Sequence, residues 1–351
     1  MQIHLRTADD DTIVRAISAS RWAPPDGSRS LDLTNLWALP GLADAHAHLS
    51  ADTLALQPAH PGEVRRRLYA CVQAGVFLCL DKGWCDDVVL RIATDRAGPR
   101  VEAAGSMISA PGGYYPDFAV EADESDLASA VAERVRAGSA WVKIVGDWPR
   151  RGGDASRFSQ EALARATALA HAGGARVAVH TMAPGTPSAA VEAGVDSIEH
   201  GLHLTPPDLA VLAGRGGVWV PTILRMEEVL AEMRPGSTGS QVVGAGLENV
   251  ERLLPLAAEM GVVVLAGSDL AVPSTRIGAE SVALARRGLP VRQAIAAAGS
   301  GVWASIGGAS GFAVGAPADL VAFDRDPRSD LDVLAEPTVV VHRGRVVRDR
   351  R

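Results

Sequence analysis

Residues 39–48 read LPGLADAHAH and join a short apolar run to two histidines that lie two positions apart. In a β-strand, residues i and i+2 point to the same side, so His46 and His48 are expected to project together from the end of this strand. Two imidazoles on one side of a strand can bind one metal ion. Because histidine pairs also occur on ordinary solvated surfaces, the other strand ends must decide between these interpretations.

The rest of the chain alternates short apolar runs with longer amphipathic segments, which is typical of parallel strands that are each covered by a helix. Residues 159–174 (SQEALARATALAHAGG) and 248–261 (ENVERLLPLAAEMG) resemble helices, and both end in glycine, as helices often do. The eight apolar runs are Leu39–His46, Gly75–Asp81, Arg100–Gly105, Ala140–Val145, Arg176–His180, Ser197–His200, Val218–Thr222 and Val262–Asp269. This order predicts an α/β fold, a (β/α)8 TIM barrel over residues 39–311.

The two ends of the chain follow a different pattern. Residues 1–38 and 312–351 contain short strand-like runs separated by Pro, Gly and Asp. Neither end could bury a core alone, so we expect one small β-sandwich domain formed from both. An exposed strand edge on this domain would suit contact with a second copy of the chain, and a homo-oligomer is therefore considered.

Composition narrows the class of protein. The chain has 351 residues, of which 47% are hydrophobic and 21% charged, an ordinary globular balance. The formal net charge of -7 argues against a nucleic-acid-binding surface and favours a small-molecule substrate. The acidic start and the lack of a long apolar run predict no membrane span and a cytoplasmic location. The three cysteines form no CxxC pair, so neither a disulfide framework nor a cysteine zinc site is expected.

Three further metal-binding residue types stand where predicted strands end. His180 closes RVAVH, His200 closes DSIEH and Asp269 closes VVVLAGSD. Catalytic groups of barrel enzymes gather at the carboxyl ends of the strands. One histidine at such a place is usually structural, but four of the nine histidines end predicted strands here, and chance explains that poorly.

Lys143 lies within the apolar run AWVKIVG. A buried ammonium is costly, and a free one would also repel two dications. If its amine reacts with CO₂, the resulting carbamate is an anion that can bridge two metal ions. The alternative is an ordinary ion pair with a carboxylate such as Asp147.

Taken together, these stretches resemble the amidohydrolase superfamily, in particular its prolidase-like and imidazolonepropionase-like branch. The matching stretches occur in family order: LPGLADAHAH, GPRVEAAGSMISAPGG, WVKI, RVAVHTM, EAGVDSIEHG, WVPT, LAGSD and GAPADLVAFDRDP. The resemblance implies a binuclear metal-dependent hydrolase that cleaves an amide or related C–N bond of a dipeptide, N-acyl amino acid or cyclic amide by attack of a metal-bridged hydroxide.

The resemblance also implies a role for each ligand. His46 and His48 would bind the more buried metal ion, and His180 and His200 the more exposed one, which polarises the substrate carbonyl. A carboxylated Lys143 would bridge the two ions, and Asp269 would bind the first ion and serve as proton shuttle. His200 and Asp269 are thus the expected catalytic residues, and nitrogen and oxygen ligands suit two Zn²⁺ ions, although Mn²⁺, Co²⁺ or Fe²⁺ could also bind.

Side chains on the predicted loops at the same face are candidates for substrate binding: Trp84, Tyr114, Tyr115, His203 and Arg225. Arg225 could bind a substrate carboxylate through both guanidinium nitrogens, or lie on the surface. Tyr114 stands where relatives with a PGGH stretch have a histidine, which argues against a simple transfer of their substrate preference.

Some alternatives stay open at this level. Residues 234–241 (RPGSTGSQ) predict a loop in the 234–246 region, either a lid or a solvated surface loop. The same metal site could hydrolyse a lactone, carbamate or phosphoester. A protein of another class, a catalytically silent barrel that only binds a ligand, would be favoured if a metal ligand were missing.

Overall fold

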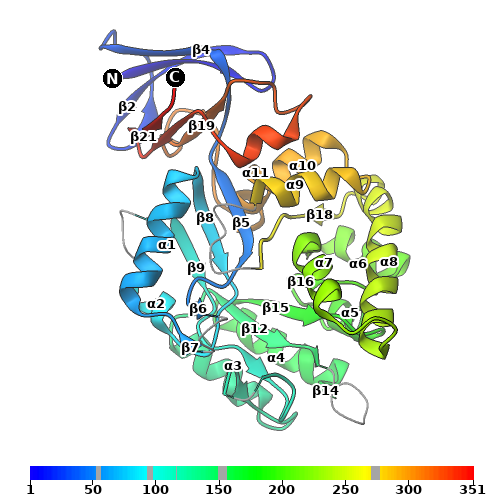
Figure 1. Ribbon diagram of the computed structural model, residues 1–351. Coiled ribbons are helices and arrows are strands. Elements are labelled where there is room, and N and C mark those ends of the chain that lie inside the picture. The colour runs from blue at the N-terminus through cyan, green and yellow to red at the C-terminus, as the bar shows by residue number, and fades with distance from the viewer. Residues whose placement is uncertain (53–56, 93–97, 116, 149–155, 270–276) are drawn as a thin grey trace.

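A computed structural model describes residues 1–52, 57–92, 98–115, 117–148, 156–269 and 277–351 (Figure 1). Its larger part contains two parallel sheets, and each of the eight predicted runs overlaps one of their strands. The first sheet has the order β5-β8-β9, with β5 (Leu42–Ala47), β8 (Val76–Asp81) and β9 (Arg100–Ala103). The second has the order β11-β10-β12-β15-β16-β17-β18, with β10 (Ile108–Ser109), β11 (Val120–Glu121), β12 (Trp141–Val145), β15 (Arg176–Thr181), β16 (Ser197–His200), β17 (Val218–Val220) and β18 (Val263–Val264).

Backbone hydrogen bonds connect the edges of these two sheets. Ala140 N–H donates to the carbonyl of Ala103 (3.0 Å), and Ala45 N–H donates to that of Ala266 (2.9 Å). All residues of β8 and β12 are buried, as expected for strands covered on both faces. The predicted α/β class with parallel strands is confirmed, and its closure into one eight-stranded barrel remains a prediction that these bonds favour.

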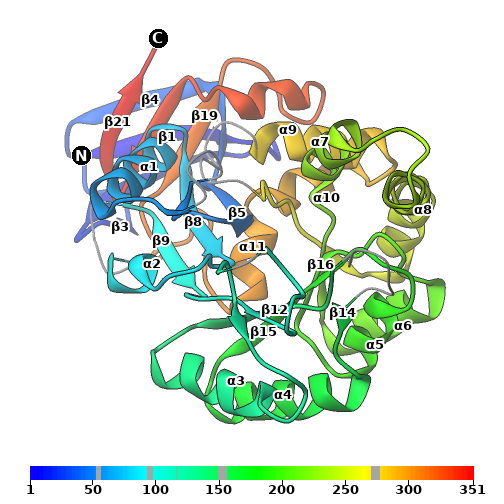
Figure 2. The ribbon, with the colours of Figure 1, turned by 60° about the horizontal axis from the view of Figure 1, so that its bottom comes forward.

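Helices lie outside the strands (Figure 2). Local sequence explains their ends: the Ser159 hydroxyl accepts a hydrogen bond from Ala162 N–H at the start of α4, and Thr205 and Asp208 form a capping box at the start of α6. The helices are α1 (Pro61–Gln73), α2 (Val88–Ile92), α3 (Leu127–Arg136), α4 (Gln160–Ala172), α5 (Thr186–Glu192), α6 (Pro206–Arg215), α7 (Ile223–Glu232), α8 (Thr238–Met260), α9 (Ile277–Arg286), α10 (Val291–Ala297), α11 (Ser300–Ser305) and the 3₁₀ helix η2 (Leu331–Ala335). Among the described residues, none of the helices is both long and apolar enough to cross a bilayer.

The prediction of a loop over residues 234–246 is wrong for residues 238–246, which are helical. Helix α8 begins at Thr238, directly after Ser237, whose hydroxyl accepts a hydrogen bond from Ser240 N–H. The glycines of this segment disfavour a helix, but the cap and the burial of Val243 and Leu247 outweigh them. A flexible lid over residues 238–246 is therefore not what the structure has.

Strands from both ends of the chain form one seven-stranded sheet with the order β21-β20-β19-β4-β1-β2-β3. These are β1 (Gln2–Thr7), β2 (Thr12–Ser18), β3 (Arg21–Ala23), β4 (Ser30–Leu39), β19 (Leu320–Phe323), β20 (Val339–His342) and β21 (Arg345–Asp349), and two small hairpins pair β6 (Ala51–Asp52) with β7 (Gln57–Pro58) and β13 (Asp147–Trp148) with β14 (Ser156–Arg157). The terminal sheet has its own apolar cluster, which includes Ile3, Leu5, Trp22 and Leu320. The joint contribution of both ends agrees with expectation, whereas the sandwich architecture and the boundaries 1–38, 39–311 and 312–351 stay predictions.

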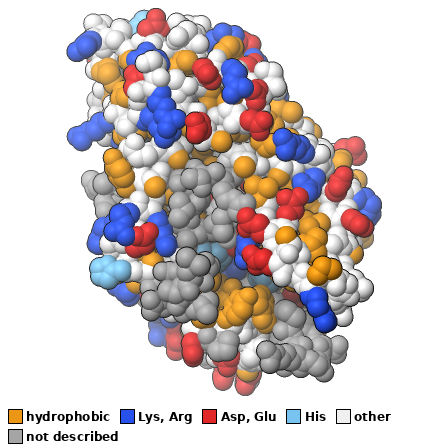
Figure 3. Space-filling model, viewed as in Figure 1, with side chains coloured by type: hydrophobic (Ala, Val, Ile, Leu, Met, Phe, Trp, Pro, Cys, Tyr) orange, Lys and Arg blue, Asp and Glu red, His pale blue; other side chains and the backbone are white. Residues whose placement is uncertain are grey.

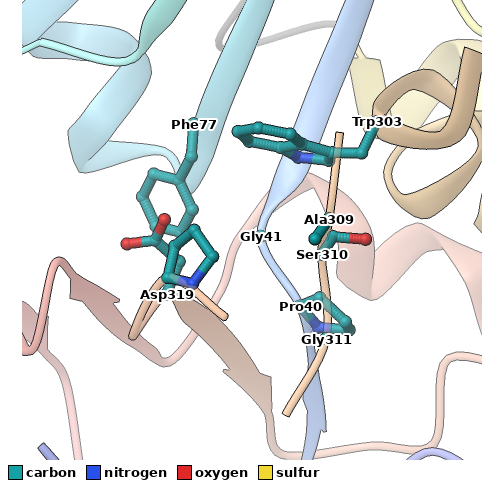
Figure 4. A pocket seen from close by; sticks show the side chains of 9 residues that line it. Pro40, Gly41, Phe77, Trp303, Ala309, Ser310, Gly311 and Asp319 are labelled. Atoms are coloured by element: carbon teal, nitrogen blue, oxygen red, sulfur yellow. The ribbon is translucent and has the colours of Figure 1, made fainter. Parts of the chain in front are cut away.

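A small pocket lies beside the terminal sheet, between Phe77, Trp303 and Asp319 (Figure 4). Its free volume of about 10 Å³ is far below the ~300 to 1,000 Å³ of small-molecule sites. It contains none of the predicted ligands, so we do not regard it as a substrate site.

Candidate metal centre

His46, His48 and Asp269 form a compact cluster. The Nε2 atoms of His46 and His48 are 3.2 Å apart, and Asp269 Oδ1 lies 3.2 Å from the first and 3.0 Å from the second. Two ligands at tetrahedral positions ~2.1 Å from one ion are separated by roughly 3.4 Å, so this spacing is close to that of a metal site. The three atoms form the one group of three or more His, Cys, Asp or Glu side chains with metal-binding spacing in the described part of the chain.

The other ring nitrogen of each histidine faces an acceptor. His46 Nδ1 lies 2.5 Å from Glu199 Oε2, and His48 Nδ1 lies 2.5 Å from the carbonyl oxygen of Gly83. If Nδ1 carries the proton in both rings, both Nε2 atoms direct lone pairs toward each other and toward Asp269. A cation between these acceptors would stabilise such a cluster, and the site therefore fits a divalent metal ion.

The backbone holds this cluster through a second set of contacts. The Asp44 carboxylate accepts hydrogen bonds from His46 N–H and Ser268 N–H, which joins the end of β5 to the segment before Asp269. Asp269 N–H donates to the His46 carbonyl (2.7 Å). Gly267 leaves no room for a side chain, because a Cβ there would lie 2.6 Å from His46 Cβ. The ligand positions thus depend on tight packing between the first and eighth runs.

His180 and His200 form a second pair, with His180 Nδ1 2.9 Å from His200 Nε2. Burial holds the pKa of His180 well below its usual range and lowers that of His200 to about 3, so both rings are neutral and able to bind metal. The Thr222 hydroxyl donates to the Pro221 carbonyl and lies 2.6 Å from His200 Nδ1, where it can accept a proton. Within the described residues His180 Nε2 has no hydrogen-bond partner.

Lys143 lies beside the first cluster. Its ammonium nitrogen is 3.4 Å from His46 Nε2, its residue is 2% exposed, and burial lowers its pKa to about 8. The alternative partner, Asp147, accepts hydrogen bonds from the backbone N–H groups of Met182 and Ala183. Since the rings of His46 and His200 are 5.5 Å apart, the six predicted ligands occupy one continuous region.

The predicted substrate-binding residues are divided. Tyr114 and Tyr115 lie near the site, since the Tyr114 ring is 4.6 Å from Trp148, whose ring is 5.8 Å from His180. His203 lies elsewhere: its Nε2–H donates to the Val242 carbonyl, and its side chain lines a pocket of about 440 Å³ that includes none of the six ligands. His203 is thus not placed with the metal cluster.

Arg225 lies on α7 and forms ion pairs with Glu228 and Glu232 on the same helix. It also acts electrostatically on Tyr114: burial and the charge of Asp269 raise the pKa of Tyr114, and Arg225 opposes this. Arg225 is therefore close enough to Tyr114 to contribute to the same region.

Five aromatic side chains, which we call the aromatic arc, connect the two histidine groups. Successive ring centroids are 5.6 Å apart for His48 and Trp84, 5.1 Å for Trp84 and Phe118, 6.2 Å for Phe118 and Tyr115, and 5.0 Å for Tyr115 and Trp148. The arc consists of Trp84, Phe118, Tyr114, Tyr115 and Trp148. In Figure 3 histidine atoms are visible near the middle of one face, with hydrophobic side chains beside them.

Sequence reasoning missed several residues that contact this region. Glu199 stands beside His200 in DSIEH, where alternation in a strand would place the two side chains on opposite sides. His200 has a φ of 61°, which ends the strand geometry there. Trp148 and Lys82 each lie within a few residues of the end of a predicted strand, and this location could have identified them as candidate site residues.

Comparisons with known proteins identify the family of this chain. Residues 37–347 match the amidohydrolase family. A protein of Mycobacterium tuberculosis (strain ATCC 25618 / H37Rv), described as uncharacterized, is 35% identical over 324 residues, which cover 88% of this chain and 85% of the relative. The imidazolonepropionase of Salinispora tropica is 26% identical over 352 residues, covering 86% of this chain and 83% of that protein.

The solved structure of a Xaa-Pro dipeptidase with bound methionine has a TM-score of 0.83 to this chain at 23% sequence identity, and the match covers 99% of each chain. The two proteins therefore share a fold. From the family match over most of its length, the chain belongs to the amidohydrolase family and is a hydrolase that acts on carbon–nitrogen bonds.

Proposed function

We propose that this protein is a binuclear metal-dependent hydrolase that cleaves an amide or related C–N bond of a small molecule. The observation that carries the proposal is the cluster of His46 Nε2, His48 Nε2 and Asp269 Oδ1, three acceptor atoms within 3.2 Å of one another. Buried acceptors are arranged in this way when a cation completes them.

In this proposal His46, His48 and Asp269 would hold one ion, His180 and His200 would hold the other, and a carboxylated Lys143 would serve as a ligand for both. Neutral imidazoles and carboxylates suit Zn²⁺. The metal ions, when bound, supply an activated water molecule and polarise the scissile carbonyl group. The proposal extends to the fold, since it requires the two parallel sheets to form one closed barrel whose strand ends meet at the site.

Asp269 is the residue proposed to move the proton. Its side chain is 14% exposed, compared with 0% for His46, so it is the more accessible of the two. The pKa of Asp269 is held well below its usual range: burial acts to raise it, but His46, His48 and His200 outweigh burial. As a carboxylate it can accept the proton of the attacking water and pass it to the leaving nitrogen. His200 is proposed to act as a ligand of the ion that polarises the carbonyl group. Two contacts hold it in place: its Nδ1 lies 2.6 Å from the Thr222 hydroxyl, and its backbone carbonyl accepts a hydrogen bond from Trp219 Nε1–H (2.9 Å).

The aromatic arc supports a substrate with an apolar or aromatic group next to the scissile bond. Arg225, close to Tyr114, supports a carboxylate on the same substrate, because a guanidinium binds a carboxylate through two hydrogen bonds. These features favour N-acyl amino acids and dipeptides with a large apolar side chain. The proposal also includes a cytoplasmic location and assembly into a homo-oligomer. It further includes a division into a barrel domain, residues 39–311, and a small domain formed by residues 1–38 and 312–351.

The test has two parts. Metal analysis of protein prepared without chelator is expected to give about two ions per chain. A screen of N-acyl amino acids, dipeptides, cyclic imides, carbamates, lactones and phosphoesters is then expected to find turnover among the amides, with benzyl side chains preferred over methyl. Turnover confined to lactones, carbamates or phosphoesters would contradict the amide assignment, and ligand binding without any turnover would identify a silent binding protein.

A further inference from the structure

Lys82 and Glu199 form an ion pair that is completely shielded from solvent. Lys82 directly follows β8, and Glu199 lies in β16; both side chains are 0% exposed. Lys82 Nζ is 3.4 Å from Glu199 Oε1. A buried pair of charges seldom adds net stability over apolar side chains of similar size, because both charges lose their hydration. Stability alone is thus a poor reason for this pair.

Each oxygen of Glu199 faces a polar neighbour. Oε1 accepts a hydrogen bond from the Ser197 hydroxyl (2.5 Å) in addition to facing Lys82, and Oε2 lies 2.5 Å from His46 Nδ1. One carboxylate therefore joins the buried ammonium to the imidazole at the centre of the metal cluster. It faces the ring nitrogen that points away from the other ligands.

Lys82 is held from two further directions. Its ammonium nitrogen lies 3.7 Å from the centre of the Trp141 ring, a cation–π contact, and its backbone N–H donates to the Ala47 carbonyl (2.8 Å). Ala47 stands between His46 and His48. The backbone of Lys82 is thus bonded to the strand that carries both histidines, whereas its side chain contacts Trp141 in β12 and Glu199 in β16.

We propose that Glu199 and Lys82 are positioning residues for metal binding: Glu199 accepts the Nδ1 proton of His46, so that Nε2 presents its lone pair to the metal, and Lys82 holds Glu199 in place. The proposal rests on the proposed metal-dependent function. A carboxylate behind a ligating histidine selects its tautomer and ring orientation, and removal of such a partner typically weakens metal binding by about 10- to 100-fold.

The competing explanation is that Glu199 only neutralises Lys82. Three variants separate the two: Glu199→Gln, Lys82→Met, and the double variant. For each, the dissociation constant of Zn²⁺ is measured by competition with a chromophoric chelator, the visible spectrum is recorded with Co²⁺ in place of Zn²⁺, and unfolding of the metal-free protein is followed in urea. We expect Glu199→Gln to weaken Zn²⁺ binding by about 10- to 100-fold and to change the Co²⁺ spectrum, with a smaller loss for Lys82→Met.

The double variant decides the question, because it leaves neither charge buried alone and so avoids the main risk of misfolding. If Glu199 positions His46, the double variant binds Zn²⁺ as weakly as Glu199→Gln does, although the metal-free double variant is more stable than the metal-free single variant. If Glu199 only neutralises Lys82, the double variant recovers wild-type Zn²⁺ affinity and spectrum, and the proposal is overturned.

Asp319→Asn is a matched control, since Asp319 pairs with a different buried histidine, His342, at 3.2 Å, outside the metal cluster. It is expected to leave Zn²⁺ affinity unchanged, and an equal loss there would overturn the specific role of Glu199. Wild-type protein that binds no metal would instead refute the proposed function itself, before any variant is compared.

Discussion

Replacing Gly267 by alanine should disturb the metal cluster without touching a ligand. A Cβ at this position would lie 2.6 Å from both His46 Cβ and Val220 Cγ1, and 3.1 Å from the backbone nitrogen of His46. Carbon atoms in contact are normally ~3.5 to 4.0 Å apart, so the neighbours must move by ~1 Å. Because Val220 belongs to the buried strand β17, part of this movement has to fall on His46.

Such overpacking costs about 1 to 3 kcal/mol of unfolding free energy. A functional site tolerates displacements of only ~0.5 Å, so Gly267→Ala should also lose metal. Urea unfolding of the metal-free protein measures the first effect, and elemental analysis after dialysis measures the second.

Gly244→Ala is the matched control. Gly244 lies within helix α8, and a Cβ there would meet no atom within 4 Å. Alanine should therefore stabilise the protein by about 0.5 to 1 kcal/mol and leave the metal content unchanged. If Gly267→Ala kept wild-type stability and metal content, the argument that close packing holds His46 in place would be wrong.

Three further predictions address the ligands and the buried charges. Lys143→Ala should lose most metal and activity, measured by elemental analysis and turnover, and retention of both would exclude a bridging carbamate. Asp269→Asn should keep the fold, seen by circular dichroism, but reduce turnover by at least ~100-fold, and wild-type rates would remove it as the proton shuttle. Burial raises the pKa of Glu280 from 4.5 to about 7, so between these pH values the folded protein keeps a proton that the unfolded chain loses. The free energy of unfolding should therefore fall as pH rises across that range. Glu280→Gln should show a smaller fall between pH 5 and pH 8 in urea unfolding, whereas the same pH dependence as wild type would refute this role of Glu280.

Much of the fold could be predicted from local pattern. Each of the eight apolar runs overlaps a strand, because a parallel strand buried on both faces needs consecutive apolar residues. The error at residues 238–246 has an equally local origin: Pro235, Gly236 and Gly239 in RPGSTGSQ suggested a loop, and the tertiary burial of Val243 and Leu247 decided for a helix.

For the site, the sequence by itself determined which metal-binding residues end strands, since a ligand after an apolar run can be recognised within a few residues. It could not determine which side chains meet. Glu199 and His46 are separated by more than 150 positions in the chain, yet their atoms are 2.5 Å apart. Only the tertiary structure brings Lys82 and Glu199 behind His46 and leaves His203 in another pocket, because such contacts depend on how distant strands pack together and not on the neighbours of each residue in the chain.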